Sequence, residues 1–239
     1  MADRPALALN GIVSGYNGPP ILNGLSLEVA HGQLITVVGP NGHGKTTLLK
    51  TISGLVNLHQ GAIELEGTSI ARLSPDAIAA RGVAHVPQGD LLFPQMTVEE
   101  NLQMGAYVEK NAQVIAERMN EVFTRLPKLA ERRCQIASTL SGGERRMAGI
   151  GRGLMMGGRV LLIDEPSLGL APLVIEQIYS VIADLKASGR SILLVEENPA
   201  RVIGLADKIH LLDNGEFVWS GLPDELMARD ELLSTYLGG

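Results

Sequence analysis

A glycine-rich loop at residues 39–46 constrains the fold of this chain more than any other feature. It reads Gly-Pro-Asn-Gly-His-Gly-Lys-Thr and matches the pattern G-x-x-x-x-G-K-S/T. A continuous apolar run at residues 34–38 precedes it, as expected of a strand covered on both faces, and a helix is expected from about Gly44. A strand, a glycine loop and a helix in this order predict a phosphate-binding turn within an α/β fold.

The residue types in this loop suit a bound phosphate chain. Glycine lets the main chain turn its N–H groups inward, and a helix amino terminus adds unpaired N–H donors. The Lys45 ammonium adds a positive charge, and the Thr46 hydroxyl is an oxygen ligand of the kind that Mg²⁺ prefers. The residues predicted to bind nucleotide here are Gly39, Pro40, Asn41, Gly42, His43, Gly44, Lys45, Thr46 and Thr47.

Two acidic residues follow a second apolar strand. The run Val-Leu-Leu-Ile at residues 160–163 ends in Asp164 and Glu165. Because successive strand residues point to opposite sides, the two carboxylates are expected to have different roles. We predict that Asp164 holds Mg²⁺, directly or through water, and that Glu165 polarises the water molecule that attacks the γ-phosphate.

The rest of the chain predicts an α/β core with a helical insertion. Strands expected near residues 6–13 and 21–29 are close together in sequence, which favours an antiparallel start. Helical periodicity dominates residues 96–135, and strand–helix alternation returns from residue 159. A helix is expected near residues 199–206, followed by a hairpin with Asn214-Gly215 as its turn.

The length and these boundaries predict a single domain. The chain has 239 residues, and we assign residues 1–88 and 157–239 to the nucleotide-binding core and residues 89–156 to a helical subdomain. The net charge of -6 and the 3% aromatic content are a poor match for a nucleic acid partner. Since no run approaches about 18 apolar residues, no direct membrane span is expected.

One further motif narrows the family. Leu140-Ser-Gly-Gly-Glu144 opens a predicted helix, with Ser141 as a good N-cap, and it offers a second anion-binding surface in addition to the phosphate loop. With this motif the whole chain resembles the nucleotide-binding subunits of ABC transporters, because its motifs follow the order of that family. The resemblance implies a P-loop NTPase core of the ABC ATPase type with an N-terminal antiparallel β subdomain and an inserted helical subdomain.

The resemblance also implies roles for further residues. Ser141, Gly142, Gly143 and Glu144 would cover the γ-phosphate of ATP held by the opposite subunit of a head-to-tail dimer. Tyr16 lies where the family stacks an aromatic ring on adenine, and Gln88 lies where its glutamine reaches the metal and the γ-phosphate. Glu197 lies where the family generally has a catalytic histidine, and a carboxylate there should be repelled by phosphate.

Within this family the chain is similar to the smaller ATPase of branched-chain amino acid importers. The residues that carry the similarity are Pro-Ser-Leu-Gly-Leu-Ala-Pro at 166–172, Phe93-Pro94-x-x-Thr97-Val98-x-Glu100-Asn101, and Leu194-Val195-Glu196-x-Asn198. The similarity implies a second ATPase subunit and transmembrane permease subunits as partners, and a location at the cytoplasmic face of a bacterial inner membrane. Urea importer ATPases, and soluble ABC proteins that act on DNA or ribosomes, are the alternatives.

Overall fold

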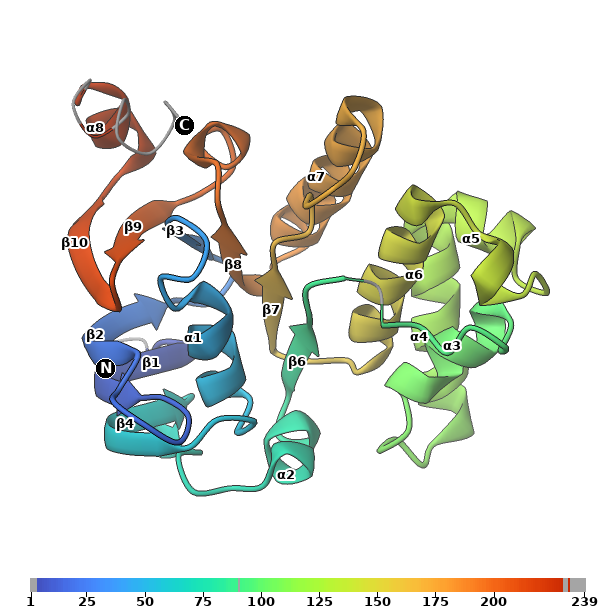
Figure 1. The fold of residues 1–239 in the computed structure, drawn as a ribbon. Helices are drawn as coiled ribbons and strands as arrows, with labels where there is room; N and C mark the ends of the chain where they lie inside the picture. Colours follow the sequence, from blue (N-terminus) through green and yellow to red (C-terminus); the bar gives the residue numbers. More distant parts are fainter. Residues whose placement is uncertain (1–3, 90, 230–231, 233–239) are drawn as a thin grey trace.

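The computed structural model describes residues 4–89, 91–229 and 232 (Figure 1). The domain ends predicted at residues 1 and 239 lie outside these described residues. Two sheets form the core. The first is antiparallel, has the order β2-β1-β4-β5, and consists of β1 (Leu7–Ser14), β2 (Leu22–Val29), β4 (Leu58–Leu65) and β5 (Thr68–Ser69). The antiparallel start expected from the sequence is therefore confirmed.

The second sheet is mostly parallel and has the order β10-β9-β3-β8-β7-β6. Its strands are β3 (Leu34–Val38), β6 (Val83–Val86), β7 (Val160–Asp164), β8 (Ser191–Glu196), β9 (Lys208–Asp213) and β10 (Glu216–Gly221), of which β10 is antiparallel to β9. Both faces of this sheet are covered, and every residue of its central strands β3, β7 and β8 is buried. In β7, for example, Val160 and Leu162 enter one hydrophobic core while Leu161 and Ile163 enter the other.

The two cores differ in which helices supply them. Helix α1 (Lys45–Ile52) packs between the two sheets, and its Leu48, Leu49 and Ile52 belong to the same core as the antiparallel strands. Helix α7 (Pro172–Ala187) covers the opposite face of the parallel sheet together with the helical region (Figure 1). Of the two short helices, α2 (Pro75–Ala80) adds Ile78 to the first of these cores, and α8 (Pro223–Met227) adds Leu226 to the second.

The helical region follows β6 and stands to one side of the sheets in Figure 1. Its helices are α3 (Val98–Gly105), α4 (Ala112–Arg125), α5 (Pro127–Glu131), a 3₁₀ turn η1 (Ala137–Thr139) and α6 (Gly142–Met155). A capping box of Thr97 and Glu100 is present at the start of α3. Within α6, a side chain at Gly153 would overlap Val86 of β6, and one at Gly151 would lie 2.9 Å from Leu102 of α3. These glycines therefore let α6 pack closely against the core and against α3.

Two predictions about the C-terminal part have opposite outcomes. The hairpin is confirmed, because Asn214 and Gly215 have φ angles of 47° and 80° and join β9 to β10. The helix expected near residues 199–206 is wrong: the structure has a 3₁₀ turn, η2 (Pro199–Arg201), followed by irregular turns. Asn198 caps Ala200 at its start, and Gly204 lowers helix propensity in the segment that follows. No helix among the described residues is long and apolar enough to span a membrane.

Candidate nucleotide site

The predicted site residues meet at the carboxyl edge of the parallel sheet. Strands β3, β7 and β8 run in the same direction and are neighbours, so the segments that follow them emerge side by side. The phosphate loop follows β3, the acidic pair ends β7, and Glu197 directly follows β8. Open α/β sheets bind ligands at this edge, because there the loops and helix amino ends converge.

The loop at residues 39–46 takes a conformation that requires glycine. A side chain at Gly39 would overlap the carbonyl of Leu212, and Gly44 has a φ angle of 109° with Leu22 packed against it. Among the described residues, no side chain caps the amino end of α1 at Gly44. The first main-chain N–H groups of α1 therefore have no intrahelical acceptors, and this end of the helix suits a phosphate group.

Lys45 is buried, and all three of its ammonium protons have acceptors. Its Nζ lies 2.7 Å from the Gly39 carbonyl oxygen, 2.9 Å from that of Pro40 and 2.9 Å from Oε1 of Glu165. The side chains of Lys45 and Glu165 are only 3% and 4% exposed, so water screens their attraction weakly. A phosphate oxygen that binds Lys45 must replace one of these three partners.

Asp164 and Thr46 form the part of the site that suits a divalent cation. The Thr46 hydroxyl donates to Oδ1 of Asp164 at 3.2 Å, while Oδ2 is buried and has no hydrogen-bond partner among the described residues. Burial is the main reason that the pKa of Asp164 is raised, to about 6. A buried carboxylate oxygen without a donor, beside a hydroxyl, fits Mg²⁺ or its water, because a cation would compensate the carboxylate charge.

Glu165 and Gln88 lie next to this pair. The Gln88 side-chain amide donates to Oε2 of Glu165 at 2.7 Å. Glu165 has a φ angle of 41°, which is unusual for a residue other than glycine, and its main-chain N–H donates to the carbonyl of Val195 in β8. Hydrogen bonds on both sides therefore hold a strained main chain at the residue predicted to activate water.

Glu197 is exposed and faces the phosphate loop. Its Oε1 accepts a hydrogen bond of 3.0 Å from the Asn41 side chain, at the exposed tip of that loop. Its neighbour Glu196 is buried and is bound by several donors, a role that the motif analysis missed. The pattern that singled out Asp164, a carboxylate at the carboxyl end of an apolar strand, also occurs at Glu196 and could have identified it.

Tyr16 lies in the turn between β1 and β2 and is 50% exposed. It lines an open pocket of about 190 Å³ with Asn17, Leu55 and His59 among others. Ile21 and Leu22, which follow the same turn, pack near the position where a side chain at Gly44 would lie. The turn that carries Tyr16 therefore reaches the phosphate loop through Ile21 and Leu22, and Tyr16 itself is half exposed.

The structure separates the segment Ser141–Glu144 from the phosphate loop. Figure 1 shows α6 in the helical region, away from the amino end of α1. The Ser141 hydroxyl accepts from the Glu144 N–H, and the Glu144 carboxylate accepts from the Ser141 N–H at 2.8 Å. Arg132 pairs with the same carboxylate at 2.6 Å. The Ser141 and Glu144 side chains thus cap α6, and this segment does not join the phosphate loop of its own chain.

Helix α6 also contacts the segment that carries Gln88. The side chain of Arg146, which is 5% exposed, donates to the carbonyl of Gly89, and that of Arg152 donates to the carbonyl of Leu91. Arg146, the second arginine after the Ser141 motif, is therefore buried. These contacts join the helix that begins at Ser141 to the residues beside Gln88.

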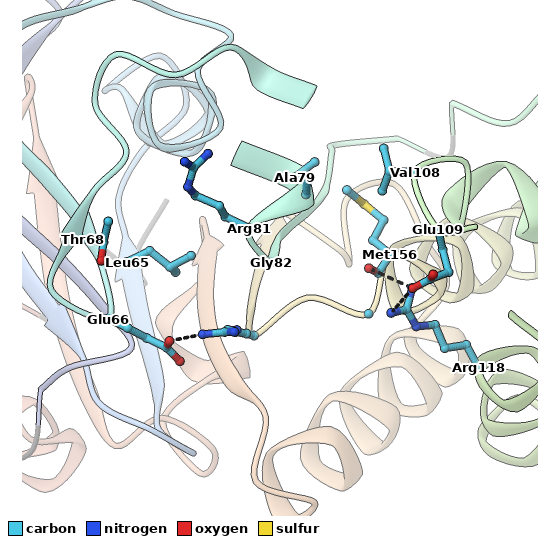
Figure 2. Close-up of a pocket in the computed structure, with 13 residues that line it drawn as sticks. Leu65, Glu66, Thr68, Ala79, Arg81, Gly82, Val108, Glu109, Arg118 and Met156 are labelled. Atoms are coloured by element: carbon cyan, nitrogen blue, oxygen red, sulfur yellow. Dashed lines mark hydrogen bonds and ion pairs between the residues drawn. The ribbon is translucent and has the colours of Figure 1, made fainter. Parts of the chain in front are cut away.

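A different pocket, of about 530 Å³, lies at the opposite edge of the sheet (Figure 2). Gly82 and Arg159, which directly precede β6 and β7, line it. The lining residues form two ion pairs, Arg159 with Glu66 and Arg118 with Glu109, and Figure 2 labels Glu66, Glu109 and Arg118. Because the phosphate loop lies at the carboxyl ends of the strands, this pocket is separate from the candidate nucleotide site.

Comparison with known proteins agrees with this geometry. Residues 22–168 match the family model described as ABC transporter. The chain belongs to the ABC transporter family. It is an ATP-binding subunit of this family, and it hydrolyses ATP. The resemblance inferred from the sequence motifs is therefore confirmed.

Individual relatives span nearly the whole chain. The high-affinity branched-chain amino acid transport ATP-binding protein BraG of Pseudomonas aeruginosa is 39% identical over 98% of this chain and 100% of its own. The lipopolysaccharide export system ATP-binding protein LptB of Haemophilus influenzae is 29% identical over 97% of each chain. The ADP conformation of MJ1267, an ATP-binding cassette of an ABC transporter, has a TM-score of 0.87, with 26% identity over 98% of this chain and 99% of its own.

Proposed function

We propose that this chain is the ATPase subunit of an importer for branched-chain amino acids, and that it hydrolyses ATP at the carboxyl edge of its parallel sheet. The observation that carries the proposal is the cluster of Lys45, Thr46, Gln88, Asp164 and Glu165. These residues come from three separate parts of the chain, and hydrogen bonds or ion pairs join them into one site. The arrangement has a cation, an acid beside a hydroxyl and a second acid, as phosphoryl transfer requires.

In this proposal, residues 39–47 bind the phosphate groups through main-chain N–H groups and the Lys45 ammonium. Tyr16, which is 50% exposed, stacks on the adenine ring. Thr46, Asp164 and Gln88 hold Mg²⁺ through oxygen ligands. These side chains would hold the ion, which would supply positive charge to neutralise the phosphate groups.

Glu165 acts as the general base. In the structure its carboxylate is paired with Lys45 and with Gln88. A γ-phosphate at Lys45 competes with that ion pair and releases the Glu165 carboxylate to accept a proton from water. ATP binding and activation of the base are thereby linked through one lysine.

Glu197 is the residue of this site that departs from the family pattern. We infer that it acts beside the γ-phosphate, since it lies against Asn41 of the phosphate loop. Its negative charge disfavours a nearby triphosphate, and the Asn41 amide holds it at the tip of the loop instead. We therefore expect slow hydrolysis of ATP at the subunit's own phosphate loop.

Import of branched-chain amino acids is supported by the sequence similarity to BraG, which is 39% identical over 98% of this chain. LptB, whose name refers to export, is also similar along its length but at lower identity. The residues Pro166-Ser-Leu-Gly-Leu-Ala-Pro172 also favour this importer subfamily. A urea importer shares these features and is the alternative substrate class.

The proposed partners are a second ATPase subunit and a pair of permeases. Ser141–Glu144 acts on the nucleotide of the second subunit, because it lies apart from the phosphate loop of its own chain. An open groove of about 280 Å³ between α2 and the helical region is lined by exposed apolar side chains that include Phe93, Tyr107 and Val108. Such a patch marks a contact surface. We assign it to a cytoplasmic segment of the permease, which places the subunit at the cytoplasmic face of the inner membrane.

Replacing Glu165 with glutamine tests the hydrolytic site. The Glu165→Gln variant keeps the shape of the side chain and removes the charge, so turnover of ATP should fall by roughly 10²–10⁴. ATP affinity should be retained or increased, because Lys45 loses a competing carboxylate. Turnover and ATP binding are measured on the full chain, with Glu176→Gln on α7 as a control that should match the parent. Turnover within twofold of the parent would overturn the assignment of Glu165.

The same substitution tests the transported solute. In cells of the source organism that carry Glu165→Gln in place of the parent gene, uptake of labelled leucine should fall while uptake of labelled urea should not. Loss of urea uptake with unchanged leucine uptake would move the proposal to the alternative substrate class. Unchanged uptake of both solutes would contradict import of either.

A further inference from the structure

A buried carboxylate, Glu196, lies directly behind the residues that face the nucleotide site. It ends strand β8, and its side chain is only 1% exposed. Its Oε1 accepts hydrogen bonds of 2.5 Å from the Ser167 and Tyr179 hydroxyls. Its Oε2 accepts from the Glu197 N–H at 3.0 Å and lies 3.5 Å from the Arg201 guanidinium. We refer to Glu196, Ser167, Tyr179 and Arg201 as the Glu196 clamp.

The clamp joins three segments of the nucleotide site. The Glu196 carbonyl accepts from the N–H of Gly39, the first residue of the phosphate loop, at 3.2 Å. The Glu196 side chain binds Ser167, which lies two residues after Glu165, and it also binds the main chain of Glu197. One residue thus contacts the phosphate loop, the loop that follows the acidic pair, and the segment after β8.

The clamp is fully hydrogen-bonded, as a buried charge requires. The Ser167 hydroxyl donates its one proton to Glu196 and accepts from Arg201, so both of its bonding directions are used. Burial and the nearby carboxylate raise the pKa of Tyr179, which keeps its hydroxyl protonated as a donor. A well-packed apolar group of the same size would stabilise a core as well as a buried ion pair does. Unlike an apolar group, however, the clamp has directional hydrogen bonds, and these fix the position of each loop that it contacts.

From these contacts we propose that Glu196 is a positioning residue for ATP hydrolysis. It holds residues 166–171, which follow Glu165, in a defined position relative to Glu197 and the phosphate loop. Because it touches none of the groups that bind nucleotide except through main-chain atoms, its effect is on geometry and not on affinity. This inference rests on the proposed function, since it requires that Glu165 be the base at this site.

Two variants test the clamp at different strengths. Glu196→Gln keeps the size of the side chain but removes the charge that faces Arg201, and Tyr179→Phe removes one donor and leaves the ring in place. We expect kcat for ATP to fall at least tenfold in Glu196→Gln and severalfold in Tyr179→Phe. The dissociation constant for ATP should stay within threefold of the parent in both variants. These quantities are measured on the full chain, with kcat calculated per folded molecule.

Asp207→Asn provides the matched control. Asp207 pairs with Lys186 at 2.6 Å and accepts from the N–H of Leu34, so this substitution also converts a paired carboxylate into an amide. It lies at the amino end of β3, at the opposite edge of the sheet from the phosphate loop. Asp207→Asn should lower thermal stability as Glu196→Gln does, while its kcat stays at the parent value.

A double-mutant cycle then examines whether the clamp acts as one unit. Ser167→Ala and Glu196→Gln remove the same hydrogen-bonded contact, so the double variant should lose little more kcat than Glu196→Gln alone. If the losses in kcat from the two single substitutions multiply in the double variant, Ser167 and Glu196 do not act through one contact and the inference is overturned. Parent values of kcat in both Glu196→Gln and Tyr179→Phe would also overturn the inference.

Glu165→Gln, measured in parallel, separates this inference from the proposed function. If Glu165→Gln abolishes turnover while both clamp variants turn over normally, only the clamp inference fails. If Glu165→Gln retains turnover, the proposed base is wrong and the clamp inference fails with it.

Discussion

At the scale of single residues, the nucleotide site is organised by competition for a few charged groups. Lys45 binds two carbonyl oxygens of its own loop and the Glu165 carboxylate, so a phosphate oxygen must replace one of them. The Asn41 amide holds the exposed Glu197 carboxylate. The Lys45–Glu165 and Asn41–Glu197 contacts each join a cation or an amide to an acid that a triphosphate would repel, and the electrostatic balance of the site depends on these two pairs.

Glu197 carries a residue-scale prediction. A carboxylate about 4 Å from a phosphate oxygen, at an effective dielectric constant near 20, costs about 4 kcal/mol before any relaxation. Glu197→Gln removes this repulsion and retains an oxygen that can accept from Asn41. We expect it to bind ATP more tightly and to hydrolyse ATP at least as fast as the parent. Both quantities are compared by titration and by steady-state turnover.

Glu176→Gln serves again as the control for a lost surface charge. If Glu197→Ala abolishes hydrolysis as completely as Glu165→Gln does, then Glu197 is itself catalytic and the proposed repulsion is the wrong account of its role.

At the scale of elements, helix α6 connects the two parts of the molecule through close packing. Gly153 faces Val86 of β6, and Gly151 faces Leu102 of α3. The Arg118 guanidinium donates to the carbonyls of Met155 and Met156 at the carboxyl end of α6, where a positive charge is favourable. Glycines that would weaken an isolated helix are therefore compensated by the contacts that they permit.

The packing of α6 gives an element-scale prediction. Gly153→Ala forces a methyl group into Val86, and overpacking of a core typically costs about 1–3 kcal/mol. The gain of about 1 kcal/mol in helix propensity offsets part of this cost. We expect a net loss of unfolding free energy, measured by urea denaturation. Gly204→Ala is the control, because a methyl group there meets no atom within 4 Å among the described residues.

The Gly153 prediction also has a clear contrary outcome. Equal or higher stability of Gly153→Ala would mean that α6 moves away from β6 at little cost. The close contact would then not hold the helical region against the parallel sheet.

At the scale of the whole molecule, stability should fall when the solution becomes mildly acidic. Burial lowers the pKa of His85 and of His210 to about 4. Below pH 6.5 the unfolded chain binds protons at these residues while the folded chain does not, so each histidine lowers stability as pH falls from about 6.5 to 4. Asp164 acts in the opposite direction, because burial raises its pKa to about 6 and the folded chain takes up that proton first.

The two histidines outweigh the single aspartate. Linkage arithmetic gives a net loss of about 2–3 kcal/mol on going from pH 7.5 to pH 5. We expect this loss in the unfolding free energy from urea denaturation without nucleotide. His210→Gln should make the pH dependence shallower, because it removes one of the two buried histidines. Equal stability at pH 5 and pH 7.5 would contradict this account of the histidines.

Features that depend on neighbouring residues could be predicted from the sequence. The phosphate loop, the apolar strand before it and the Asn214-Gly215 hairpin all follow from local conformational preferences. The capping boxes at Thr97 and Ser141 likewise need only residues three positions apart. The helix expected near residues 199–206 failed because a short periodic segment with Pro199 and Gly204 has little propensity of its own and no packing that requires a helix.

Contacts between distant residues were decided by the tertiary structure. Lys45 meets Glu165, and Asn41 meets Glu197, only because β3, β8 and β7 are neighbours in the sheet. The same strand order makes Glu196 the residue that joins three loops. The apolar runs in the sequence indicate which strands are buried on both faces. They do not specify the order in which these buried strands pair. That order depends on packing of the whole chain, and it determines which carboxylate lies beside which cation.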